Sequence, residues 1–425
     1  MNRFSLLTAA AVLLLSSGSL CADEQSEIRL NPEIFNDGYC DVDVSRYDFL
    51  KLDLNKIELN GDDWSGLARK FEASRNRDSL FTVVYLGDSH VQADYNGSTL
   101  RRILQRASYG AGRGLVIPFK LAKTNQPLDY SIAIDGAFDA SKLIKTPWLT
   151  DMPFSGIGIQ PVAEDYTIHL SCETPFKYMR FFHIGDATVC GVSDTTLLSG
   201  ISRGWVELSR DVNSIDVNFK RRERSVFGGV ELLSDTVGTL VHSIGNNGAT
   251  FASYPLSDDF ERGVASLAPD LVIVALGTNE AFSRISEENL AENIDALISV
   301  IHTASPKTKI LLVSPTECYR RVYRRRGKRR RRTSSLVVNT KVARVRNVIL
   351  DYAKDKGIAV YDRFALAGGS GSAVKLKSTS VIGRDGIHCS VTGYRLWGTL
   401  MGDAIIQQLK IPESFEADSE TVSDL

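Results

Sequence analysis

Short apolar runs, each closed by glycine or a polar turn, recur along this chain and alternate with helical patterns. Unbroken runs of this kind, rich in β-branched residues, are typical of strands that are buried on both faces. They lie at Phe81–Leu86, Thr239–Ile244, Leu271–Ala275, Lys309–Val313 and Ile358–Tyr361. Helical patterns occupy about 96–107, 257–267, 287–304, 336–356 and 391–410. Strands that alternate with helices require crossover connections, so we predict an α/β domain with a parallel sheet covered on both faces.

Residues from about 127 to 235 have a different pattern. Alternating segments are separated there by Gly, Asp, Asn and Pro, which indicates an inserted all-β sandwich, jelly-roll-like in type. The predicted strands are Tyr130–Ile134, Tyr166–Ser171, Tyr178–His183, Gly204–Leu208, Ser214–Phe219 and Val226–Leu232. We therefore divide the chain into a signal peptide (1–22), an N-terminal extension with the first part of the α/β domain (23–126), the β insert (127–235), the second part of the α/β domain (236–412) and a polar tail (413–425).

The first residues predict export. Arg3 precedes a mostly apolar run at Leu6–Leu15, and the small-residue stretch Ser16–Ser19 follows it. This run is too short to stay in a bilayer as a spanning helix, and no other stretch is long enough to be transmembrane. We expect a periplasmic or cell-surface protein. A lipoprotein anchor at Cys21 stays open, although Leu20 is a poor residue before a lipidated cysteine.

Cysteine usage leaves two alternatives. In an oxidising compartment Cys172 and Cys190 would be the first candidates for a disulfide, because they share one strand-rich segment. The alternative is that the thiols are unpaired and pack as small hydrophobes. No Cys or His spacing predicts a metal site.

Three predicted strands are followed by motifs that suit acyl transfer. Gly87-Asp88-Ser89-His90 places Ser89 at a sharp strand-to-helix turn, where a nucleophile is exposed. Asn279 follows Leu271–Ala275, and its amide could donate to a developing oxyanion. Gly248 follows Thr239–Ile244, and its N–H could approach the same anion because no side chain blocks it. Each motif alone could equally be an ordinary turn.

A fourth motif, Asp385-Gly386-Ile387-His388, precedes the last predicted helix. A general base needs one ring nitrogen on the nucleophile and a carboxylate on the other, and His388 with Asp385 could supply both. By itself His388 would more simply be a structural histidine. Because the carboxyl ends of parallel strands meet at one edge of the sheet, the four motifs together predict a Ser-His-Asp site that needs no metal or organic cofactor.

The order of these motifs resembles the SGNH (GDSL-like) hydrolase family. The resemblance implies a flavodoxin-like three-layer fold, with Ser89 as nucleophile, Gly248 and Asn279 as oxyanion donors, His388 as base and Asp385 as its partner. His90 replaces the leucine of the GDSL form. The chain is similar to bacterial peptidoglycan O-acetylesterases in this GDSH motif, in the block Ile244–Ala249, and in the inserted module, which resembles a family 35 carbohydrate-binding fold.

The resemblance implies an exported serine esterase that removes O-acetyl groups from a cell-wall glycan, with peptidoglycan as the first candidate. Two alternatives stay open. One is an esterase or lipase that acts on another acylated glycan or on a lipid. The other is a glycan-binding protein whose hydrolase site is idle.

One segment is strongly basic. Ten of the thirteen residues from Arg320 to Arg332 are Lys or Arg, and without their ten charges the formal net charge would change from −1 to −11. Charge blocks of this kind are usually solvated loops. Nucleic-acid binding is another common interpretation, but export argues against it. Our functional hypothesis is that the segment attracts an anionic polymer, such as acidic O-acetylated polysaccharide, toward Ser89.

Overall fold

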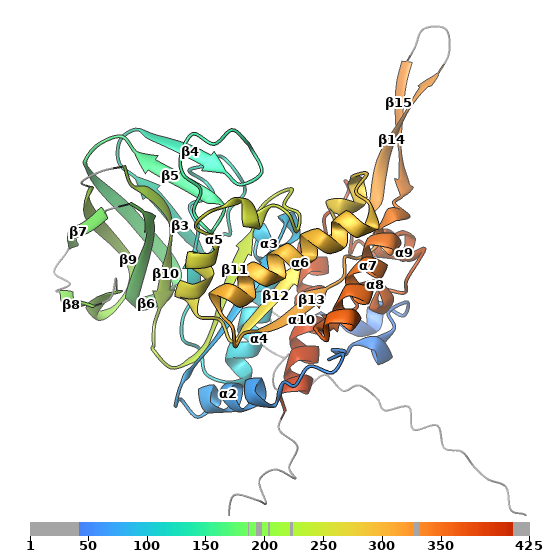
Figure 1. Cartoon of the computed structure of the whole chain (residues 1–425), viewed down its shortest axis with the longest axis horizontal. Coiled ribbons are helices and arrows are strands. Elements are labelled where there is room, and N and C mark those ends of the chain that lie inside the picture. The colour runs from blue at the N-terminus through green and yellow to red at the C-terminus, as the bar shows by residue number, and fades with distance from the viewer. Residues whose placement is uncertain are drawn as a thin grey trace, which may run out of the picture.

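The computed structural model describes residues 42–185, 187–192, 198–202, 205–221, 224–326 and 331–410. The predicted signal peptide with Cys21, and the predicted tail at 413–425, lie outside these residues. Figure 1 shows three parts: an α/β domain, a β-rich module at its side, and a hairpin that projects from the domain.

The centre of the α/β domain is a five-stranded parallel sheet in the order β11-β1-β12-β13-β16. Its strands are β1 (Leu80–Gly87), β11 (Gly238–Gly245), β12 (Leu271–Ala275), β13 (Lys309–Val313) and β16 (Ala359–Tyr361). Counted along the chain, this is the 2-1-3-4-5 order of flavodoxin-like folds, in which ligands bind beyond the strand ends where the order reverses. The predicted fold class is therefore confirmed.

Helices cover both faces of this sheet, so each strand contributes alternate side chains to two cores. Phe81, Val83 and Tyr85 face one core, whereas Val84 and Leu86 face the other. The helices around the first core are α2 (Ser65–Arg75), α3 (Ser89–Gln92), α4 (Tyr95–Ala107), α8 (Arg363–Leu366), α9 (Ser372–Ser378) and α10 (Val391–Leu409). The other core is covered by α5 (Phe260–Leu267), α6 (Glu287–Ala304) and α7 (Lys341–Lys356). None of the helices in the described ranges is both long enough and apolar enough to cross a membrane.

The β module is a nine-stranded antiparallel sheet system, which agrees in type with the predicted all-β insert, although one of its strands, Gly114–Val116, lies before the predicted start at about residue 127. Its strands are β2 (Gly114–Val116), β3 (Tyr130–Ile134), β4 (Phe138–Lys142), β5 (Ile157–Pro161), β6 (Asp165–Ile184), β7 (Ala187–Val192), β8 (Leu198–Ser202), β9 (Trp205–Arg221) and β10 (Val226–Leu233). Two pairs of predicted strands are each one long strand, β6 and β9. Their pairing shifts register between Ser171 and Tyr178, so bulges absorb the residues around Pro175 that predict a turn.

The module and the α/β domain share one continuous core. Phe154 of the module packs on α5 so closely that a Cβ on Gly263 would lie 2.0 Å from its ring. The Phe154 N–H donates to Asp259 Oδ2 over 3.0 Å, and Asn246 Nδ2 donates to the Ser155 carbonyl over 3.0 Å. Because Asn246 belongs to the loop that carries Gly248, the module helps to fix that loop.

The basic segment is a β-hairpin, so its interpretation as an irregular loop is wrong. Strand β14 (Tyr319–Arg326) pairs antiparallel with β15 (Arg331–Val338), and Figure 1 shows the pair projecting away from the rest of the molecule. Val322, Tyr323 and the β-branched and aliphatic residues of 333–338 favour strands. The sequence interpretation weighed only the charge. Because β15 extends to Val338, the helix predicted from residue 336 begins only at Lys341.

The proposed pairing of Cys172 with Cys190 is wrong. Strand β9 lies between β6, which carries Cys172, and β7, which carries Cys190. Next-nearest strands are separated by about 10 Å, beyond the roughly 7 Å that a disulfide spans between Cα atoms. Cys172 is buried, Cys190 is exposed, and both are free thiols.

Candidate active site

The predicted site residues meet at the carboxyl edge of the parallel sheet. Ser89 follows β1, Gly248 follows β11, Asn279 follows β12, and His388 precedes α10. All four line one cavity of about 630 Å³. Its other lining residues are Ala93, Asn125, Asn247, Thr278, Phe282, Ile387 and Tyr394.

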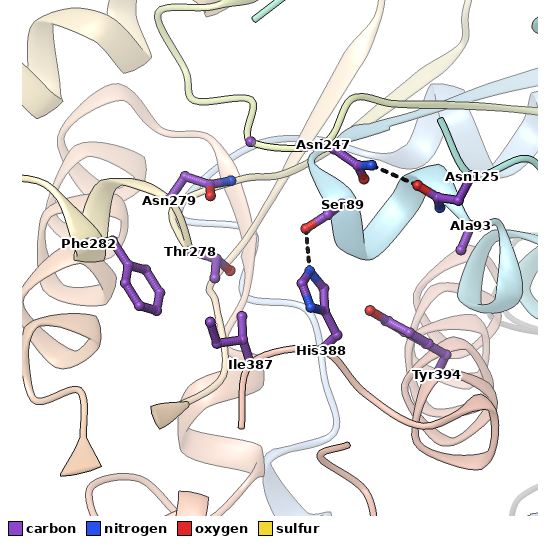
Figure 2. A pocket seen from close by; sticks show the side chains of 11 residues that line it. Ser89, Ala93, Asn125, Asn247, Thr278, Asn279, Phe282, Ile387, His388 and Tyr394 are labelled. Carbon is purple, nitrogen blue, oxygen red and sulfur yellow. Dashed lines mark hydrogen bonds between the residues drawn. The ribbon is translucent and has the colours of Figure 1, made fainter. Parts of the chain in front are cut away.

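A chain of hydrogen bonds joins the predicted triad. Ser89 Oγ lies 2.9 Å from His388 Nε2, and His388 Nδ1 lies 2.6 Å from Asp385 Oδ2. Figure 2 shows the serine hydroxyl and the imidazole meeting at the centre of the cavity. When Nδ1–H donates to the carboxylate, Nε2 is the nitrogen that accepts the serine proton.

The loop around His388 holds its own carboxylate in place. Asp385 Oδ1 accepts the backbone N–H groups of Ile387 at 2.9 Å and His388 at 3.0 Å, so Oδ2 is directed at the ring. Partial burial raises the pKa of Asp385, but hydrogen bonds from the His388 ring and from the two N–H groups outweigh it and hold the pKa below its usual value. Asp385 is therefore ionised at neutral pH and stabilises a protonated His388.

The turn that exposes Ser89 depends on Gly87. A Cβ at position 87 would lie 2.4 Å from Val91 Cγ2 and 2.8 Å from the Ala275 carbonyl oxygen, so only glycine fits between β12 and the helix that follows. Asp88 caps α3 by accepting the His90 N–H over 2.8 Å. Ser89 is the first residue of α3, and the first N–H groups of a helix have no partner within it. The Ser89 N–H is thus available to an anion in the cavity.

Gly248 has the geometry of an oxyanion donor. Its φ of +84° is in the left-handed region, which glycine adopts without strain. The neighbouring N–H groups are engaged: that of Asn247 donates to Gln92 Oε1 over 2.7 Å, and that of Ala249 donates to the Asn246 carbonyl over 2.9 Å. Within the described part of the chain, the Gly248 N–H has no protein acceptor.

Asn279 is anchored beside Gly248 by its side-chain amide. Its Nδ2 donates to the Ala249 carbonyl over 2.9 Å and, more weakly, to Asp88 Oδ2 over 3.2 Å. Burial raises the pKa of Asp88 to about 6, against the lowering effects of the His90 N–H and of Arg363. The bond to Asp88 is the longer of the two. An oxyanion in the cavity would therefore replace Asp88 as the acceptor of that Asn279 N–H.

A family model gives the first comparison with known proteins. Residues 214–396 match the GDSL-like Lipase/Acylhydrolase family. Over these residues the chain is GDSL-like. The matched range of the GDSL-like hydrolase contains Gly248, Asn279, Asp385 and His388, whereas Ser89 lies before it, on the far side of the β module. The protein is a carboxylic ester hydrolase.

A solved structure shares the overall fold of this GDSL-like hydrolase, and two others align with part of the chain. A structure described as a peptidoglycan O-acetylesterase in action aligns with 83% of this chain and 99% of its own, at 19% identity and a TM-score of 0.67. A lipase/acylhydrolase from Enterococcus faecalis aligns with 41% of this chain and 80% of its own, at 21% identity and a TM-score of 0.30. A carbohydrate esterase family 3 protein from Talaromyces cellulolyticus aligns with 41% and 73%, at 15% identity and a TM-score of 0.29. No curated protein matches the sequence.

Sequence reasoning missed a polar network that fixes the Gly248 loop of the GDSL-like hydrolase. Gln92 Nε2 donates to the Asn125 carbonyl over 2.8 Å, and Asn247 Nδ2 donates to Asn125 Oδ1 over 2.7 Å. Gln92 also accepts the Asn247 N–H, so α3 and the Gly248 loop are joined through one side chain. Gln92 could have been proposed as a site residue, because it lies three residues after Ser89 on the same helix. No local pattern in the sequence marks Asn125 as a site residue.

The positions of Tyr394 and His90 beside His388 were also not predicted. The Tyr394 hydroxyl lies 3.2 Å from His90 Nδ1, and the His90 ring lies 5.4 Å from the His388 ring, centroid to centroid. Burial, with the nearby Arg363 charge, lowers the pKa of His90 to about 3. The GDSH histidine is therefore neutral at physiological pH and does not repel the positive charge that His388 gains. Within the described residues no group of His, Cys, Asp and Glu side chains is placed to hold a metal ion.

Proposed function

We propose that this hydrolase is exported and removes O-acetyl groups from a cell-wall glycan, with peptidoglycan as its substrate. The observation that carries the proposal is the hydrogen-bonded chain from Ser89 through His388 to Asp385, at 2.9 and 2.6 Å, beside two candidate oxyanion donors. The fold shared with a peptidoglycan O-acetylesterase over 83% of the chain supports the choice of substrate. The predicted signal peptide at 1–22 supports export.

The proposed reaction proceeds through an acyl-enzyme. Ser89 Oγ attacks the acetyl carbonyl while His388 Nε2 takes the hydroxyl proton, and Asp385 stabilises the imidazolium. The oxyanion is held by the Ser89 and Gly248 N–H groups and by the Asn279 amide. When the intermediate collapses, His388 returns the proton to the sugar oxygen, and the sugar leaves as an alcohol. Water activated by His388 then releases acetate and restores Ser89.

The polar part of the cavity lining suits a sugar ester. Three asparagines, Asn125, Asn247 and Asn279, border the nucleophile together with the Tyr394 phenol. Amides and phenols hydrogen-bond sugar hydroxyls, whereas long acyl chains need a continuous apolar channel. A lipase function is the competing candidate, and the acyl-length dependence below decides between the two.

The decisive experiment measures acetate release from O-acetylated peptidoglycan by the mature protein, with Ser89→Ala as the matched control. We expect release that the variant abolishes, and faster hydrolysis of small acetyl esters than of octanoyl or palmitoyl esters. Serine-dependent hydrolysis of small esters without release from peptidoglycan would reject the substrate but keep the enzyme. A preference for long acyl chains would favour a lipase, and no serine-dependent activity at all would favour a glycan-binding protein.

Asn279→Ala tests the oxyanion assignment. Because the amide interaction strengthens as negative charge develops, we expect kcat to fall by about 10²–10³-fold with a small change in KM. Thr278→Ala, which changes the adjacent lining residue, should have a much smaller effect. An equal loss in both variants, or a loss accompanied by a lowered unfolding temperature, would assign Asn279 a structural role instead.

A further inference from the structure

The β14–β15 hairpin belongs to neither main sheet of the molecule. It forms a separate two-stranded sheet, and Figure 1 shows it standing out from the α/β domain. Two-stranded ribbons are marginally stable in water without further packing. In the register of the pair, Arg325 is aligned with Arg332 and Arg326 with Arg331. A concentration of like charge disfavours strand pairing, so the high positive charge of this segment favours a negatively charged partner.

The composition of the hairpin specifies the chemistry of that partner. Nine of its ten basic residues between 320 and 332 are arginines. Arginine presents a planar fork of donors that binds carboxylates in a bidentate manner, which a lysine cannot do. Tyr323 is 55% exposed among these arginines and offers an aromatic ring to a sugar face. Since the rest of the protein is acidic, the hairpin is the region to which an anionic polymer would be drawn.

The root of the hairpin packs directly on the loop that carries the triad. The Tyr319 N–H donates to the Gly386 carbonyl over 2.7 Å. A Cβ on Gly386 would lie 2.8 Å from Tyr319 Cβ and 3.2 Å from Leu336 Cδ1, so both hairpin strands contact this residue. Gly386 lies between Asp385 and His388 in the sequence. A ligand bound along the hairpin therefore starts beside the catalytic loop.

The length of the hairpin sets a size requirement on the ligand. Strand β14 has eight residues, which at about 3.3 Å per residue reach roughly 26 Å from root to tip. A small ester held at Ser89 cannot touch the outer arginines. Only a polymer can occupy the cavity and the hairpin together, and binding at two linked points raises its affinity above that of either point.

We propose that the β14–β15 hairpin is a docking arm for a carboxylate-bearing glycan, which binds the arginines while one of its acetylated sugars enters the Ser89 cavity. The proposal rests on the proposed function and names the feature of the substrate that the arm recognises. The arm contacts the catalytic loop, so a ligand of the arm lies beside the esterase site. This favours the substrate polymer over nucleic acid or an anionic membrane, neither of which the esterase reaction requires.

Binding is tested separately from catalysis, in a Ser89→Ala background. The arm variant changes Arg324, Arg325, Arg326, Arg331 and Arg332 to Gln. The control variant removes the same charge from five exposed residues away from the hairpin, Lys51, Lys56, Arg69, Lys307 and Lys354. At low salt we expect the arm variant to bind insoluble O-acetylated peptidoglycan about tenfold more weakly than its parent, and the control to bind nearly as its parent does. The difference should shrink in 0.5 M salt.

Two further measurements can overturn the proposal. Conversion of the glycan carboxylates to amides should weaken the parent to the level of the arm variant, and unchanged binding to the amidated glycan would contradict a carboxylate site. Arm-dependent binding that is tighter to double-stranded DNA or to vesicles with anionic lipid than to the glycan would assign the arm to those partners. Equal losses in the arm and control variants would leave only a net-charge effect and reject the arm.

Kinetics with the Ser89 enzyme separate failure of this proposal from failure of the proposed function. The ratio of kcat/KM for the polymer to kcat/KM for a small acetyl ester should fall about tenfold in the arm variant and stay constant in the control. If the unmodified enzyme releases no acetate from peptidoglycan, the proposed function fails, while the binding assay still decides whether the arm recognises the glycan.

Discussion

His388→Ala is expected to lower kcat for a small acetyl ester by about 10⁵–10⁶-fold, with little change in KM. The imidazole is the group within hydrogen-bonding distance of Ser89 Oγ, at 2.9 Å, so without it the hydroxyl has no base. Ser89→Ala should cause a loss of similar size. Because both residues act in one step, the double variant should be no slower than either single variant.

Initial-rate measurements at high enzyme concentration, with thermal unfolding of each variant as the control for folding, test this prediction. Multiplicative losses in the double variant would show that Ser89 and His388 do not act as a unit. A loss of less than about 100-fold in His388→Ala would mean that another base serves Ser89.

Asp385→Asn should lower kcat by about 10⁴-fold while the loop keeps its structure. The amide oxygen can still accept the N–H groups of Ile387 and His388, as Oδ1 does now. The amide nitrogen, however, replaces Oδ2 opposite Nδ1, and a donor there favours the ring tautomer whose Nε2 carries a proton. That nitrogen can no longer accept the proton of Ser89.

The measurement is the kcat of Asp385→Asn beside that of Asp385→Ala. The asparagine variant should unfold at the temperature of the unchanged protein, whereas the alanine variant also loses two backbone hydrogen bonds and should be less stable. If Asp385→Asn retains more than a tenth of kcat, the carboxylate does not set the tautomer, and its role is limited to shaping the loop.

The sequence was sufficient to predict the sheet and the residues at its carboxyl edge. Each buried strand is an uninterrupted apolar run, and each motif follows directly on its strand, so Ser89, Gly248 and Asn279 could be placed together without knowing any packing. His388 could be added because Asp385 lies three residues before it, close enough for one loop to align both groups.

What escaped prediction depends on contacts between distant segments. Strand β6 continues through Pro175 because β9 shifts register beside it, and no local pattern reports a shift in a partner strand. Asn125 enters the site only through Gln92 and Asn247, which the fold brings to it. The many positive charges of the β14–β15 hairpin disfavour strand pairing. The short β-branched stretches beside them were therefore not sufficient to predict the two strands from the sequence.

The central position of β1 has a consequence for how the chain folds. Leu80 of β1 is aligned with Gly238 of β11, and Val83 with Leu271 of β12, so both neighbours of β1 are made long after it. At about 5–20 residues per second, the ribosome needs roughly 8 to 30 seconds to reach β11, and the strand is unpaired until then. During that time both edges of an apolar strand are open to other chains. Translation products that stop before β11 would carry Ser89 on a strand with no neighbour, and they are expected to aggregate rather than retain partial activity.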